Sequence, residues 1–158
     1  MGSWGYGPFD NDAAADLLVF ITEAGPTGWR VVRDALYSTH PQDVVGAAEI
    51  IAIALGLGTR RDERTVNLAV GRKAAVPWVR QFGRSMPSDL PALAIDACRR
   101  VLAHSRKTVR KAPAKPRTLA GLKLVNVFID EGESARKWQG TVSSLIRRLE
   151  KGRRRRHS

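Results

Sequence analysis

Residues 41–55 constrain the fold of this 158-residue chain more than any other segment. Pro41 suits the first turn of a helix, because that position needs no amide hydrogen. The Gly56-Leu57-Gly58 sequence predicts the end of that helix. From residue 44 to residue 55 the segment is apolar apart from Gly46 and Glu49. A helix that is apolar nearly all round is buried, so we expect this one to form the centre of the fold.

Apolar residues at helical spacing predict further helices on both sides of this segment. One begins after the capping residues at 10–12 and ends at Gly25-Pro26, and a second is capped by Thr27 and ends near Thr39. Later helices are predicted over residues 74–82, after the capping residue Ser88, and over residues 133–151. Residues 119–129 fit a helix or a strand. The predicted fold class is all-α, a compact bundle of five to six helices.

The domain organisation predicted from these patterns is one helical domain over residues 1–151. It starts with a leader rich in glycine and aromatic residues (1–9) and contains a charged connection of uncertain structure after Gly58. Residues 106–118 combine bases with two prolines, which is typical of a linker or exposed arm. The arginine-rich residues 152–158 are predicted to form a disordered tail.

The net charge of +12 is distributed unevenly. Residues 1–55 hold seven acids and two bases, whereas residues 56–158 hold eight acids and 25 bases. Such asymmetry indicates a polyanionic partner for the second half of the chain. The candidate phosphate-binding residues form an arm and a tail: Arg99, Arg100, Arg106, Lys107, Arg110, Lys111, Lys115 and Arg117, then Arg147, Arg148, Arg153, Arg154, Arg155 and Arg156, with Lys151 among them.

Clustered bases bind nucleic acid through its backbone by releasing counterions, whatever the base sequence. Neither cluster holds an aromatic residue on which bases could stack. We therefore predict a non-enzymatic binding module that contacts the nucleic-acid backbone. The alternative is an interaction factor of immunity or accessory type that binds an acidic protein. A solvated, solubilising surface is the simplest interpretation of the same charges.

A second cluster, Asp10, Asp12 and Asp16, could hold Mg²⁺ or Ca²⁺ and support hydrolysis. Its spacing fits no calcium loop, and capping of the first helix explains these residues better. The three histidines are far apart, and the serines lie in no nucleophile motif. We expect no catalytic residues, no metal site and no cofactor.

Cys98 is the only cysteine, so an internal disulfide and a cysteine-based zinc site are excluded. It falls within the apolar stripe that follows Ser88 and is predicted to be an inert core thiol. No apolar run reaches the roughly 20 residues of a membrane span, and no secretory signal is visible. The expected location is the cytoplasm, with no membrane partner.

The N-terminal sequence carries a recognisable pattern: Trp4, Gly5, Gly7, Phe9, Asp10, Asn11, Asp12 and Asp16. It resembles the start of a bacterial family called domain of unknown function 4259. Ala47-Ala48-Glu49 resembles the alanine-rich central helix of that family, and Trp138 with residues 145–149 resembles its terminal helix. The resemblance implies a protein of bacteria or their phages, whereas the capping pattern itself predicts a structural role for the signature. It implies no particular activity.

Overall fold

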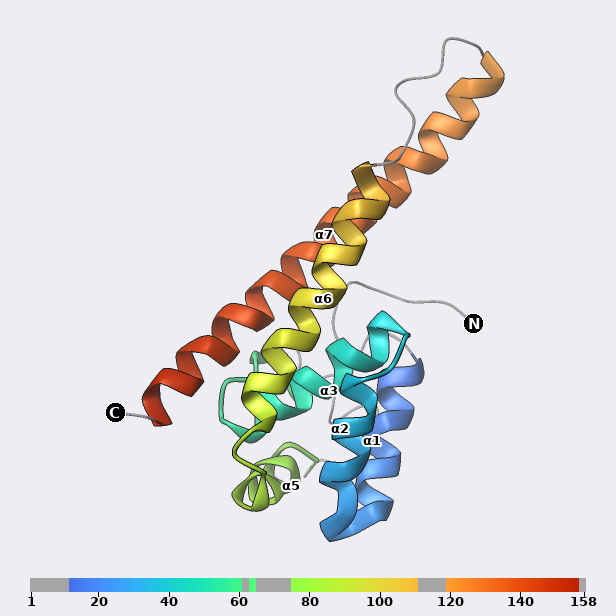
Figure 1. Ribbon diagram of the computed structural model, residues 1–158. Coiled ribbons are helices and arrows are strands. Elements are labelled where there is room, and N and C mark those ends of the chain that lie inside the picture. The colour runs from blue at the N-terminus through green and yellow to red at the C-terminus, as the bar shows by residue number, and fades with distance from the viewer. Residues whose placement is uncertain (1–11, 61–62, 65–74, 111–118, 157–158) are drawn as a thin grey trace.

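The computed structural model describes residues 12–60, 63–64, 75–110 and 119–156. These residues contain no strand, so the all-α prediction is confirmed. Their elements, in chain order, are α1 (Asp12–Ala24), the 3-10 helix η1 (Gly25–Thr27), α2 (Gly28–Leu36), α3 (Pro41–Ala54), α5 (Ala75–Phe82), the 3-10 helix η2 (Gly83–Ser85), α6 (Leu90–Arg110) and α7 (Leu119–Arg156) (Figure 1).

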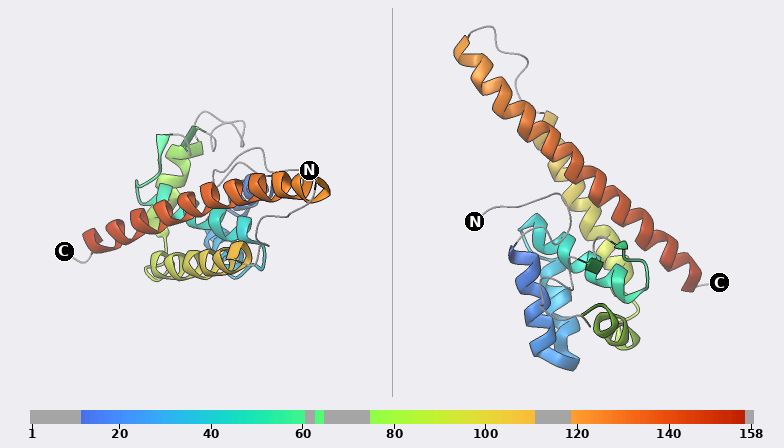
Figure 2. Two further views of the ribbon diagram at one scale, coloured as in Figure 1. Left: turned by 90° about the horizontal axis from the view of Figure 1, so that it is seen from above. Right: turned by 180° about the vertical axis from the view of Figure 1, so that it is seen from behind.

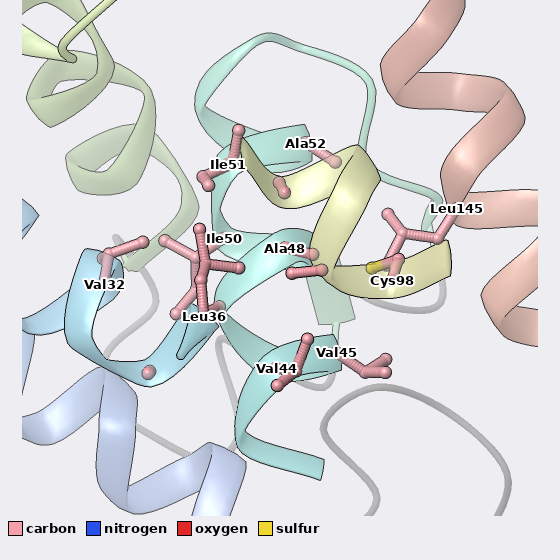
Figure 3. Packing of buried hydrophobic residues seen from close by; sticks show 14 of the residues in the cluster. Val32, Leu36, Val44, Val45, Ala48, Ile50, Ile51, Ala52, Cys98 and Leu145 are labelled. Atoms are coloured by element: carbon pink, nitrogen blue, oxygen red, sulfur yellow. The ribbon is translucent and has the colours of Figure 1, made fainter. Parts of the chain in front are cut away.

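The helix α3 forms the centre of the bundle, as its composition predicts. It packs against α1, α2, α5, α6 and α7, and residues 44–53 are all buried. Figure 3 shows Val32 and Leu36 of α2 beside Ile50, while Cys98 of α6 and Leu145 of α7 lie toward the other side of the helix. The neighbouring helices therefore bury every side of a helix that has no polar face.

The end of α3 is set by Gly56, which has a positive φ of 72°. The amide of Gly56 donates to the carbonyl of Ile53 (2.9 Å), and the amide of Leu57 donates to the carbonyl of Ala52 (2.8 Å). These two bonds close the helix as a Schellman motif, in which glycine accepts the left-handed conformation at little cost. The predicted helix end is confirmed, and the motif directs Leu57 toward α7.

The start of α2 differs from its prediction. Thr27 makes no side-chain capping bond and instead closes the 3-10 helix η1, with its hydroxyl donating to the carbonyl of Ala24 (2.9 Å). The helix also ends at Leu36, before the predicted Thr39. Ser38 then orders the turn into α3, because its hydroxyl donates to Asp43 (2.7 Å) and accepts the amide of His40.

An aromatic stack attaches α5 to α2. The rings of Trp29 and Phe82 stack with centroids 4.2 Å apart, and Trp78 stacks on Phe82 with centroids 5.1 Å apart. The indole nitrogen of Trp29 also donates to the carbonyl of Phe82 (3.2 Å). Next to it, a Cβ added to Gly83 would lie 2.7 Å from the carbonyl oxygen of Ala54. Glycine at this position therefore allows α5 to pack closely on the end of α3.

The helices α6 and α7 form an antiparallel hairpin. The amide of Gln139 donates to the hydroxyl of Ser105 (3.0 Å), and Arg99 pairs with Glu150 (2.6 Å), which fixes the register of the two helices. At the usual rise per residue, α7 is about 57 Å long and α6 about 31 Å. The N-terminal part of α7 therefore continues past the end of α6 (Figure 1 and Figure 2).

The hairpin differs from its predicted boundaries. Residues 106–110 continue α6 rather than starting a linker, whereas 111–118 lie outside the described residues. Residues 119–129, which fit a helix or a strand, are helical. The prediction of a disordered tail from residue 152 is wrong, because α7 continues to Arg156. Gly152 is buried, and a Cβ there would meet Leu57, so this glycine is a point of close helix packing instead of a helix end.

Candidate nucleic-acid interface

Arg148, a predicted phosphate contact, forms a partly buried ion pair with the core. Its two terminal nitrogens donate to the two carboxylate oxygens of Glu49, at 2.8 and 2.6 Å. One of them also donates to the carbonyl of Leu57 (2.9 Å). The Glu49 side chain is 0% exposed. Because a buried carboxylate requires a hydrogen-bonded counter-charge, Arg148 belongs to the core and not to the candidate interface.

One half of this ion pair could be found in the sequence, because Glu49 is the single acid within the apolar part of the central helix. The sequence does not reveal the partner, because Arg148 lies 99 residues away and the chain holds 27 bases. The choice depends on the rotation of α7, which places Arg148 toward Leu57 and α3 but leaves the adjacent Arg147 exposed.

Two residues of the predicted arm also have partners within the molecule. Arg99 pairs with Glu150 (2.6 Å) and lies 3.6 Å from Asp96. Arg100 donates to the carbonyl of Leu36 (2.7 Å) at the end of α2. A cation is favoured there by the helix dipole. These two arginines hold the bundle together, and their charges are partly compensated.

The exposed bases of α7 follow one face of the helix. This face, called the basic stripe, consists of Arg136, Arg147, Lys151 and Arg154, and Gly140 lies between the first two. The positions are separated by whole or nearly whole turns, so their side chains share one side of the helix. The opposite side carries the buried Val142, Leu145, Ile146 and Leu149. Packing of the apolar face on α6 and α3 thus leaves the stripe toward solvent.

The C-terminal part of α7 has a large excess of positive charge. From residue 135 to residue 156 the chain carries nine bases and one acid, Glu150, whose carboxylate bonds Arg99. Lys137 is exposed at the edge of the stripe, and Arg153 is exposed near its end. Such an excess of cations on a rigid helix attracts polyanions.

Among the described residues, Arg106 of the predicted arm and Arg154 of the predicted tail lie at opposite ends of the α6–α7 hairpin. Arg106 is exposed on α6 at the level of Arg136, since Ser105 pairs with Gln139. Arg154 lies at the other end of the hairpin, beyond the Arg99–Glu150 pair. For four of the remaining predicted contacts the structure describes only the helical backbone: Lys107, Arg110, Arg155 and Arg156. The other three lie outside the described residues: Lys111, Lys115 and Arg117.

The N-terminal signature is described only at its end. Asp12 is the first residue of α1, as the capping pattern predicts, and Asp16 is exposed on that helix. Trp4, Gly5, Gly7, Phe9, Asp10 and Asn11 lie outside the described residues. Within the described part of the chain, no three histidine, cysteine or acidic residues gather where they could hold a metal ion. The helices of that part also include none with the length and apolarity to cross a membrane.

Comparison with known families identifies the N-terminal two thirds of the chain. The model of the family described as "Domain of unknown function (DUF4259)" matches residues 2–111, which include α1 to α6. The helix α7, with the residues that we likened to a terminal helix of the family, follows the matched range. Neither a curated protein nor a solved structure matches the chain. The signature and the match over most of its length show that the chain belongs to the DUF4259 family.

Proposed function

We propose that this protein binds nucleic acid through the phosphate backbone, without catalysis, using the basic stripe of α7. The observation that carries the proposal is the exposure of Arg147 and Lys151 on the side of α7 opposite its buried apolar face. Only Glu150 lies among these bases in the sequence, and Arg99 already engages it. Exposed lysine and arginine side chains neutralise phosphates and release condensed counterions, which favours binding entropically.

The residues of the stripe support binding to the backbone rather than to bases. Each is an arginine or a lysine, and the aromatic residue within residues 136–154, Trp138, is partly buried against the core. Stacking of bases requires aromatic side chains, and base-edge readout requires an element that enters a groove with several polar contacts. Binding by the stripe is therefore independent of base sequence and depends steeply on salt.

The first test replaces two bases of the stripe, Arg147→Gln with Lys151→Gln. Affinity for a mixed-sequence DNA, measured by fluorescence anisotropy at about 100 mM salt, should fall roughly 10- to 100-fold because two phosphate contacts are lost. Wild-type affinity should itself fall about 100-fold between roughly 50 and 200 mM salt if four phosphates are contacted.

The matched control is Arg30→Gln with Arg84→Gln. Both residues are exposed, on α2 and η2 and outside the basic stripe, and the double variant loses the same net charge. Its affinity should stay within about threefold of wild type, because exposed charges outside the contact surface are largely screened by salt. Equal losses in the two variants would show a general charge effect and overturn the role of the stripe. Absence of wild-type binding at low salt would overturn the proposed function.

A further inference from the structure

One carboxylate lies among the bases near the end of α7. Glu150 stands three residues after Arg147 and directly before Lys151, and its side chain is 36% exposed. Residues three apart on a helix are neighbours, so Glu150 is within reach of Arg147 on the helix surface. A carboxylate that paired with Arg147 would neutralise a base on which the proposed function depends. It would also repel an approaching phosphate.

The structure pairs this carboxylate with a residue of the neighbouring helix instead. A terminal nitrogen of Arg99 on α6 donates to Glu150 at 2.6 Å. The other terminal nitrogen of Arg99 lies 3.6 Å from the carboxylate of Asp96, which is three residues earlier on α6. One guanidinium is therefore shared between two acids, and the stronger of its two contacts crosses from α6 to α7.

The bond to Arg99 decides which base Glu150 neutralises. Without Arg99, the bases nearest to Glu150 in its own helix are Arg147 and Lys151, both of which are exposed. Acids and bases at helical spacing attract each other, so Glu150 would then compete with phosphate for Arg147. We propose, on the basis of the proposed function, that Arg99 is a positioning residue of the phosphate-binding surface. It holds Glu150 toward α6 and leaves Arg147 and Lys151 available to the nucleic acid.

The test is a cycle of Arg99→Gln, Glu150→Gln and the double variant. Affinity for the mixed-sequence DNA at about 100 mM salt should fall roughly 5- to 10-fold in Arg99→Gln, as for the loss of about one phosphate contact. The slope of log affinity against log salt should also become less steep by about one. Glu150→Gln removes the competing acid and should bind at least as tightly as wild type. The double variant should bind within about twofold of Glu150→Gln, because Arg99 then has no acid to position on α7.

Two controls match these changes of charge. Asp96→Asn gains the same charge as Glu150→Gln but leaves the Arg99–Glu150 pair intact, so its affinity should stay within about twofold of wild type. Arg106→Gln removes an exposed base at the other end of the hairpin. Its effect should be the same with and without Glu150→Gln, because distant sites act independently. Thermal melts followed by circular dichroism verify folding, which a pair of exposed charges should affect little.

A loss on Arg99→Gln that persists in the Glu150→Gln background would overturn the positioning role, since Arg99 would then act on the phosphates by its own charge. Unchanged affinity of the single Arg99→Gln variant would overturn it as well. Both results leave the proposed function standing if Arg147→Gln with Lys151→Gln weakens binding. Absence of wild-type binding at low salt would overturn the proposed function, and this inference with it.

Discussion

Replacing Arg148 with alanine should lower the free energy of unfolding by about 3 to 5 kcal/mol, the cost of leaving one partner of a buried ion pair uncompensated. The remaining Glu49 side chain is 0% exposed and would lose both bonds that Arg148 now makes to its carboxylate oxygens. Urea denaturation followed by circular dichroism measures the effect. Because a buried unpaired carboxylate takes up a proton more readily, the loss should be smaller at about pH 5 than at about pH 8.

Two further variants isolate the ion pair. Arg147→Ala removes the neighbouring exposed base. It should change the free energy of unfolding by less than about 0.5 kcal/mol, as most exposed substitutions do. Replacing both partners with methionine should recover stability to within about 1 kcal/mol of wild type, since apolar residues of similar volume can replace a buried pair. An Arg148→Ala variant with an unchanged urea midpoint would contradict this account of the core.

Cys98 should react with a thiol reagent roughly 1,000-fold more slowly in the native protein than in concentrated urea, because the reactive species is the thiolate. The side chain is 0% exposed, and burial, together with the negative charge of Glu49, raises the pKa of this thiol to about 12. At about pH 8 an ordinary thiol with a pKa near about 8.5 is substantially ionised, whereas this one is almost wholly protonated.

Cys98 is the only cysteine in the chain. The absorbance released by a chromogenic disulfide reagent therefore measures the reaction of this thiol alone. Molecules in which the α6–α7 hairpin has opened expose Cys98 with an ordinary thiol pKa, so their population adds to the native reaction rate. The Arg148→Ala variant should react faster in proportion to its lost stability. A wild-type native rate within about tenfold of the unfolded rate would contradict the buried position of Cys98.

The helices could be predicted where local chemistry decides them. Pro41 and Gly56 mark the two ends of α3 by properties of single residues, and the apolar stripe from Leu90 to Leu102 defines α6. Long-range packing decided the elements that were predicted incorrectly. Gly152 is typical of a helix end, yet α7 continues through it because the missing side chain admits Leu57.

The candidate interface could be predicted only as a set of charges. Arg147 and Arg148 are identical neighbours in the sequence, but one turns to solvent and the other to Glu49. Arg100 likewise belongs to a run of bases, yet it bonds the end of α2. Which bases are available depends on the rotation of each helix against the core, and this rotation is a property of the assembled bundle.

The Glu49–Arg148 pair also has a consequence for folding during synthesis on the ribosome. At a rate of about 5 to 20 residues per second, Arg148 is made roughly 5 to 20 seconds after Glu49. During that interval the nascent chain lacks the cation that pairs with Glu49 in the folded protein, so burial of the central helix is disfavoured. We therefore expect the bundle to close only after Arg148 has been made, because Arg148 neutralises the buried carboxylate of the central helix.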